Sequence, residues 1–147
     1  MITAIYDKQT LETYIPQHDL ASFLHEHLDK FTDAPSAISK SIDYAFSRES
    51  GKGGYLLLAL EDGKLAGAVV LNKTGMEEFV PEYLLVYIAV DKDKRGRGLG
   101  AELINKAFEL CDASIALHVE YDNPARRLYE RLGFKSKYAE MRWQRES

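Results

Sequence analysis

A glycine-rich segment between an apolar run and an amphipathic pattern constrains the fold more than any other feature of this chain. The apolar run extends from Tyr83 to Val90, and Arg95-Gly96-Arg97-Gly98-Leu99-Gly100 then leads into apolar residues at helical spacing as far as Cys111. This order predicts a strand, a turn and a helix. Glycines let a ligand approach the backbone closely, and free N–H groups at a helix start favour an anion. With two arginines present, the segment predicts a pyrophosphate-binding loop.

Two other interpretations of the glycine segment stay open at this point. It can be a solvated basic turn that happens to contain three glycines. Gly96-x-Gly98-x-x-Ala101 also matches the loose fingerprint of a dinucleotide-binding loop, with Glu120 near the position of a ribose-binding acid. That fingerprint normally opens a much longer domain, whereas fewer than fifty residues follow Ala101.

The distribution of charge favours a small anionic ligand over a nucleic acid. The formal net charge of the 147 residues is −4, whereas the stretch from Asp91 to Arg97 holds four basic and two acidic side chains. A local basic spot on an acidic protein suits a small polyanion, so no nucleic acid partner is expected. The chain shows neither a membrane-length apolar run nor a secretory signal, and its single Cys111 cannot form an internal disulfide. These features predict a cytoplasmic protein without membrane association.

Hydrophobic periodicity predicts an α+β fold. Strands are expected at residues 2–6, 55–61, 64–72, 83–90 and 114–121, the second and third being joined by an Asp62-Gly63 hairpin turn. Helices are expected at residues 19–28, 38–46, 99–111 and 124–132. One strand–helix–strand crossover makes two strands parallel, and the remaining strands form an antiparallel meander. The expected fold is a mixed, mostly antiparallel sheet flanked by helices.

The C-terminal segment is expected to extend this sheet. Lys135 to Gln144 can hold one or two strands, with Tyr138, Met141 and Trp143 as packing residues. An edge strand near Met141 to Gln144 can pair with a second copy, because a sheet edge presents unpaired backbone groups. The sequence thus allows a homodimer but does not require one, and the oligomeric state stays open.

A second motif lies between Asp122 and Phe134, where Asn123 is followed by Ala125-x-x-Leu128-Tyr129 and Gly133-Phe134. Together with the glycine loop, this motif resembles the GNAT acetyltransferase superfamily. In that family an Arg/Gln-x-x-Gly-x-Gly/Ala loop is followed by an Asn, then Ala-x-x-Leu/Phe-Tyr and Gly-Phe. The order of elements is also similar, so the resemblance covers nearly the whole chain. It implies a single acetyltransferase domain over residues 1–147, with strands that splay after Val90 to admit acetyl-CoA.

The resemblance implies acetyl-CoA as the cosubstrate and gives several residues a role in binding it. The backbone amides of Arg95, Gly96, Arg97, Gly98, Leu99 and Gly100 would hold the pyrophosphate, and the two arginines would add charge. Ile88 and Val90 would offer backbone groups to the pantetheine arm. Asn123 stands six residues before Tyr129, whereas family members often have seven. It would bind the cofactor from a tighter turn, or else serve as a helix N-cap.

Tyr129 matches the tyrosine that in this family commonly protonates the departing CoA thiolate. A general acid within hydrogen-bond reach typically contributes about 10²–10⁴-fold to the rate. The alternative is a buried aromatic ring whose hydroxyl merely finds a partner. A general base is expected among Glu82, His118 and Glu120, each of which can also be an ordinary strand-edge residue. No His or Cys cluster has the spacing of metal ligands, so no metal is expected.

The sequence thus leads to the expectation of an acetyl-CoA-dependent N-acetyltransferase. Because Cys111 is expected in the core, the amine would attack acetyl-CoA directly, without an acyl-enzyme. A small cationic amine is favoured by acidic residues near the expected acceptor site: Glu26, Asp29, Asp33, Glu77, Glu78 and Glu82. The alternatives are a protein or peptide N-acetyltransferase and a regulatory module that binds acyl-CoA without turning it over.

Overall fold

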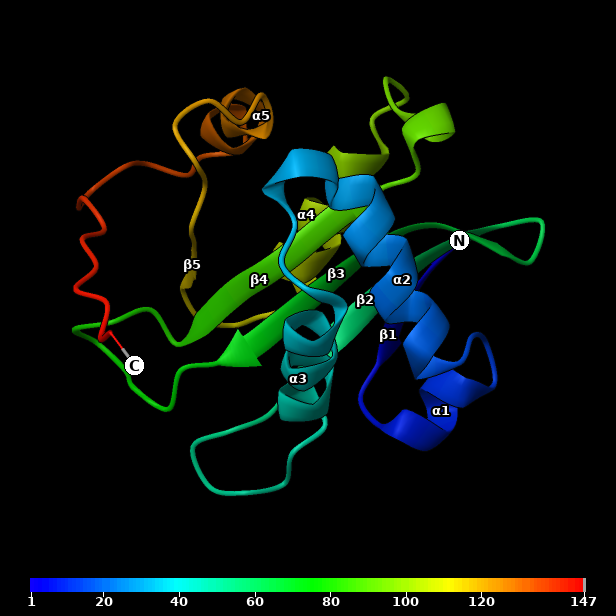
Figure 1. Ribbon diagram of the computed structural model, residues 1–147, viewed down its shortest axis with the longest axis horizontal. Helices are drawn as coiled ribbons and strands as arrows, with labels where there is room; N and C mark the ends of the chain where they lie inside the picture. Colours follow the sequence, from blue (N-terminus) through cyan, green and yellow to red (C-terminus); the bar gives the residue numbers. More distant parts are fainter. Residues whose placement is uncertain (147) are drawn as a thin grey trace.

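A five-stranded sheet with strand order β1-β2-β3-β4-β5 separates two layers of helices in the computed structural model, which describes residues 1–146 (Figure 1). The strands are β1 (Ile2–Ile5), β2 (Gly54–Glu61), β3 (Lys64–Lys73), β4 (Tyr83–Val90) and β5 (Ile115–Leu117). The first four strands pair antiparallel, and β5 pairs parallel with β4. The mixed, mostly antiparallel α+β sheet predicted from the sequence is confirmed.

Helices cover both faces of the sheet. One layer holds α1 (Lys8–Glu12), α2 (Gln17–Leu28), the short 3-10 helix η1 (Asp29–Phe31) and α3 (Pro35–Ala45). The opposite layer holds α4 (Leu99–Leu110) and α5 (Ala125–Arg131), and a second 3-10 helix, η2 (Lys92–Lys94), follows β4. In Figure 1, α2 and α3 lie in front of the sheet and α4 lies behind it. The sequence analysis did not predict the two 3-10 helices or the short helix α1, which begins where the Asp7 side chain accepts a hydrogen bond from Thr10 N at 2.7 Å.

Each helical layer forms its own hydrophobic core with one face of the sheet. Along β2, Leu56 and Leu58 belong to the core under α2 and α3, whereas Tyr55 and Leu57 belong to the core under α4 and α5. Successive side chains of a strand point to opposite faces. The central strands are therefore continuously apolar, as expected of strands buried on both faces.

Strand β4 contains a bulge that ends its pairing with β5. The ladder with β3 joins Leu71 to Leu85 and Val70 to Tyr87, so Val86 lacks a cross-strand partner. Parallel pairing with β5 stops at Leu85 and Leu117, and no pairing follows along the second half of β4. Bulges twist a strand locally and often occur beside functional sites. The strands β4 and β5 therefore separate after Leu85, earlier than the position after Val90 that the sequence suggested. No residue pattern in the sequence marks the bulge, so this position was not predictable.

The C-terminal segment differs from the sequence prediction. Residues 135–146 form neither a helix nor a strand. The exposed fractions of the expected packing residues are 81% for Tyr138, 91% for Met141 and 78% for Trp143. Aromatic residues favour a strand only where a sheet offers neighbours to pack against, and β5 has just three residues. The predicted terminal strands are therefore wrong, and so is the expected length of β5. The oligomeric state stays open.

Helix α4 packs unusually close to the sheet because β3 has a glycine beneath it. A Cβ placed on Gly67 would lie 3.0 Å from Leu103 Cδ1 and 3.2 Å from the carbonyl oxygen of Ala89. Leu103, Ile104 and Ala107 are fully buried in this contact. Since the glycine loop leads into α4, this packing fixes the loop against the end of β4. No helix in the described part of the chain is long and apolar enough to span a membrane.

We predict that Leu103→Ala lowers the free energy of unfolding by about 2–5 kcal/mol, the usual cost of truncating a fully buried leucine. Leu110→Ala is the matched control, because Leu110 lies on the same helix and is 39% exposed. Urea denaturation monitored by circular dichroism measures both. Equal losses in the two variants would contradict the role given to the contact between α4 and the sheet.

Candidate active site

A cavity of about 1000 Å³ lies where β4 and β5 separate. Most of its walls come from four segments: β4 from Leu84 onward, the glycine loop, the stretch from the end of β5 through α5, and the end of α2 with η1. Asp33 and Arg142 also belong to the lining. Most of the residues expected to bind a cofactor or act in catalysis line this cavity: Ile88, Val90, Arg95, Gly96, Gly98, Leu99, Gly100, His118, Asn123 and Tyr129. Arg97, Glu82 and Glu120 lie outside its lining. The fold thus brings together two motifs that are separate in the sequence.

The glycine loop presents open backbone to the cavity. Gly96 and Gly98 both have φ of +81°, in the left-handed region that favours glycine, and no atom lies within 4 Å of a Cβ built on either. The first hydrogen bond of α4 joins Glu102 N to the Gly98 carbonyl at 3.0 Å. The amides of Leu99, Gly100 and Ala101 therefore have no acceptor within the helix. This arrangement fits a phosphate group, which helix N-termini bind through free amides.

The two loop arginines interact with the protein rather than filling the cavity. Arg95 Nε donates to the Val90 carbonyl at 3.1 Å, and its terminal nitrogen donates to the His27 carbonyl at the end of α2. Arg97 lies 3.7 Å from a carboxylate oxygen of Glu61, which Lys94 also approaches at 3.9 Å. Arg95 thus joins α2 to the end of β4 and holds the loop, and Arg97 adds charge from outside the wall.

His27 is a positioning residue that the sequence did not reveal. Its Nδ1 accepts a hydrogen bond from the backbone N–H of Lys92 at 3.1 Å, and its Nε2 lies 3.2 Å from a carboxylate oxygen of Glu26. The ring packs on Phe23, with centroids 4.5 Å apart. His27 therefore fixes the chain just before the glycine loop. No sequence pattern reveals this role, because the hydrogen-bond partner of His27 is 65 residues away.

Tyr129 lines the cavity from α5 and is only 8% exposed. Burial raises the pKa of its phenol to about 12, so the hydroxyl keeps its proton at neutral pH. The ring packs edge-on against Phe134 at 6.0 Å between centroids. Among residues 1–146 its hydroxyl has no hydrogen-bond partner, so it is available to a ligand. The geometry suits a proton donor.

The three candidate bases lie in different surroundings. Of these, His118 alone is part of the cavity lining. Glu82 precedes β4, at the end of the strand away from the glycine loop, where its carboxylate accepts a hydrogen bond from Ser114 N at 3.0 Å. That bond lowers the pKa of Glu82, which makes it a weaker base. His118 is thus the candidate best placed to reach a substrate.

Asn123 has a local structural role similar to the helix N-cap that was weighed as an alternative. Its Oδ1 accepts a hydrogen bond at 2.9 Å from the N–H of Ala125, the first residue of α5, whereas the N-cap position itself is occupied by Pro124. The side chain also belongs to the cavity lining. This bond uses the oxygen and leaves the amide nitrogen without a hydrogen-bond partner among residues 1–146.

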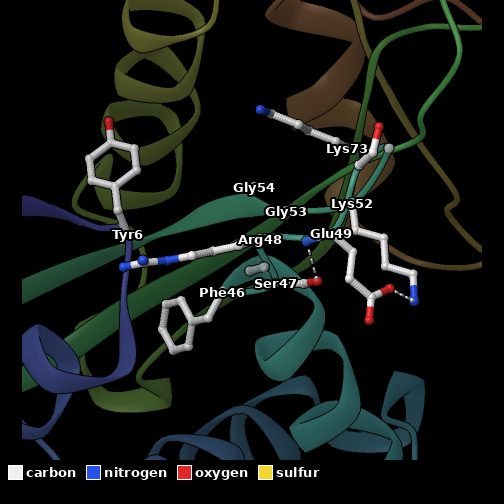
Figure 2. A pocket seen from close by; sticks show the side chains of 12 residues that line it. Tyr6, Phe46, Ser47, Arg48, Glu49, Lys52, Gly53, Gly54 and Lys73 are labelled. Carbon is white, nitrogen blue, oxygen red and sulfur yellow. Dashed lines mark hydrogen bonds and ion pairs between the residues drawn. The ribbon is translucent and has the colours of Figure 1, made fainter.

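A second hollow of about 380 Å³ lies around the turn between α3 and β2. It contains none of the residues predicted to bind or react. Figure 2 shows that the cationic ends of Arg48, Lys52 and Lys73 point in different directions, and Lys52 already pairs with Glu49 at 2.9 Å. This hollow therefore lacks groups that converge on one ligand. In the described part of the chain no group of three or more His, Cys, Asp or Glu residues is arranged to hold a metal ion.

Comparison with known proteins places the chain in a family. The model of the acetyltransferase (GNAT) family matches residues 11–134, and the chain belongs to this family of acyltransferases. A mycothiol acetyltransferase from Clavibacter michiganensis subsp. michiganensis is 38% identical over 96 residues. That match covers 61% of this chain but only 30% of the relative's length.

Solved structures support the fold. A ribosomal-protein-alanine N-acetyltransferase from Brucella melitensis biovar Abortus 2308 has a TM-score of 0.65 and 18% identity, with 98% of each chain covered. An aminoglycoside N-acetyltransferase, AAC(6')-Iy, in complex with CoA has a TM-score of 0.69 and 14% identity, covering 100% of this chain and 96% of that one. The predicted family and fold are confirmed.

We predict that the hydroxyl of Tyr129 stays almost fully protonated near pH 10.5, where an ordinary tyrosine of pKa about 10 is largely ionised. Its raised pKa places its ionisation at higher pH. Ultraviolet absorbance of tyrosinate at that pH should therefore differ little between the wild-type protein and Tyr129→Phe. If the variant loses the signal of one whole tyrosinate, the hydroxyl is not in the buried environment described.

Proposed function

We propose that this chain, acting as a single domain in the cytoplasm, transfers an acetyl group from acetyl-CoA to a primary amine of a small cationic molecule. The observation that carries this proposal is the meeting of the glycine loop and Tyr129 on the walls of one cavity. Membership of the acetyltransferase family supports acetyl-CoA as the donor. The likeness in fold to an aminoglycoside acetyltransferase solved with CoA is consistent with it.

The glycine loop would bind the pyrophosphate through its open amides. Two positive-φ glycines and the free N–H groups at the start of α4 converge there. Beyond Leu85, the edge of β4 that faces away from β3 presents backbone groups that β5 does not pair. A pantetheine arm can hydrogen-bond to such an edge as an added strand does. Ile88 is the better candidate, since the Val90 carbonyl already accepts Arg95 Nε.

Acetyl-CoA supplies an activated acetyl group as a thioester. Transfer forms a C–N bond and breaks a C–S bond, so the amine loses one proton and the sulfur gains one. Tyr129 holds its proton at neutral pH and would donate it toward the sulfur as negative charge develops there. His118, which lines the cavity, would accept the proton of the amine.

Direct attack by the amine is favoured over an acyl-enzyme. The obvious nucleophile for covalent transfer, Cys111, is 8% exposed at the end of α4, and it does not line the cavity. Burial raises the pKa of its thiol, which lowers the fraction of reactive thiolate. Both substrates would therefore be bound at the same time when the acetyl group moves.

The test of the proposed function is release of free thiol from acetyl-CoA in the presence of an amine panel. The panel holds small monoamines, diamines, amino sugars, and peptides with a free N-terminus or a lysine. We expect release with small cationic amines. Release with peptides alone would make the chain a protein or peptide acetyltransferase, and binding of CoA without release on any amine would make it a regulatory module. Either result contradicts the proposal.

We predict that Tyr129→Phe lowers kcat at least about tenfold while the Kd for acetyl-CoA changes little, because a general acid acts in the transition state. The phenyl ring keeps the packing against Phe134. Tyr138→Phe is the matched control, since Tyr138 is 81% exposed and lies outside the cavity lining. An unchanged kcat in Tyr129→Phe would remove this residue from the mechanism.

A further inference from the structure

The cavity wall contains three aspartates that differ in their partners. Asp29 lies 3.8 Å from Lys92 Nζ, and Asp122 lies 3.1 Å from Lys30 Nζ. Asp33 instead accepts a hydrogen bond from a neutral group, the hydroxyl of Tyr87. No cationic group lies within ion-pair distance of Asp33 among the described residues. Asp33 therefore differs from the other two aspartates, because its negative charge is not paired within the protein.

The surrounding structure holds Asp33 in place. Its carbonyl oxygen accepts the Thr32 hydroxyl at 2.9 Å and lies 3.0 Å from His25 Nδ1. The next helix, α3, begins two residues later at Pro35. On the side-chain end, burial and the bond to Asp33 both raise the pKa of Tyr87, so its hydroxyl stays protonated and continues to donate. A carboxylate anchored at both ends loses little freedom when it binds a ligand.

The cationic side chains that line the cavity form no ion pair with Asp33 among the described residues. Arg142 lines the same cavity, and its guanidinium pairs with Glu140, which is the main cause of its raised pKa. Asp33 contributes to that raised pKa as the smallest cause and lies beyond ion-pair distance of Arg142. Arg95, another cation of the lining, donates to two backbone carbonyls. The end of the cavity near Asp33 is therefore suited to a positively charged guest.

We propose that Asp33 binds a positive charge of the acceptor that is separate from the nitrogen that receives the acetyl group. This inference rests on the proposed function. A carboxylate that pairs with an amine stabilises its protonated form, and a protonated amine has no lone pair with which to attack. Binding at the reacting nitrogen would thus oppose the reaction, whereas binding at a second cationic group only positions it. The substrate class is a primary amine with a further cationic group, such as a diamine, a polyamine or an amino sugar.

The test compares cadaverine with pentylamine, which share a five-carbon chain and differ in the second amino group. In wild-type protein we expect a higher kcat/KM for cadaverine. Asp33→Asn keeps an acceptor for the Tyr87 hydroxyl but removes the charge. It should lower the ratio of kcat/KM for cadaverine to that for pentylamine about tenfold, as expected for loss of one hydrogen bond between charged groups. The loss should lie mainly in KM, with the Kd for acetyl-CoA unchanged.

Two further variants separate local recognition from general charge. Glu12→Gln removes one exposed negative charge from α1, outside the cavity lining, and should leave the ratio unchanged. Tyr87→Phe removes the hydroxyl but keeps the Asp33 charge, so cadaverine should remain the preferred substrate. Asp33→Ser provides a second neutral variant and should reproduce the effect of Asp33→Asn.

The outcomes distinguish this inference from the proposed function. If the wild type acetylates amines but Asp33→Asn and Asp33→Ser leave the cadaverine ratio unchanged, the role of Asp33 is wrong and the function stands. An equal fall of the ratio in Glu12→Gln also overturns it, because the effect would then come from net charge. If the wild type acetylates no amine, the proposed function fails and the role of Asp33 fails with it.

Discussion

The end of pairing between β4 and β5 is the constraint on which the rest of this structure depends. Pairing stops at Leu85 and Leu117, next to the bulge at Val86. Strand β4 cannot move across to close the gap, because β3 holds one edge and helical layers pack on both faces. The gap therefore persists as a cavity, and α5 places Tyr129 on its wall. An unpaired strand edge, which proteins usually protect, is here the surface that a ligand can use.

The glycine loop owes its position to contacts with distant elements. Arg95 bonds to the carbonyls of Val90 and His27, and the His27 ring accepts the amide of Lys92. These contacts tie the end of α2 to the segment between β4 and α4. Because the loop is held before any ligand arrives, less ordering is needed on binding. Arg95 thus acts as a structural link, and the backbone amides at the start of α4 stay open toward the cavity.

Sequence patterns predicted those features that depend on neighbours along the chain. Apolar runs located the central strands, Asp62-Gly63 located the hairpin, and the paired motifs indicated the family. Features that depend on register or on distant partners were not predictable. Val86 has no local sign of a bulge, and the bond between Tyr87 and Asp33 joins residues 54 apart. In the C-terminal segment the sequence predicted strands that the structure does not contain. Its aromatic residues favour a strand, but they are exposed, and the edge strand β5 has just three residues with which to pair.

The central claim is that the loop at Gly96 to Gly100 binds the phosphate end of acetyl-CoA. The most direct measurement is the change in backbone amide resonances when CoA is added to isotope-labelled protein. The account predicts large shifts at Gly96, Gly98 and Gly100, which lie on the cavity wall, and little change at Gly51 and Gly53 in the second hollow. Shifts confined to the second hollow, with none at the loop, would contradict it.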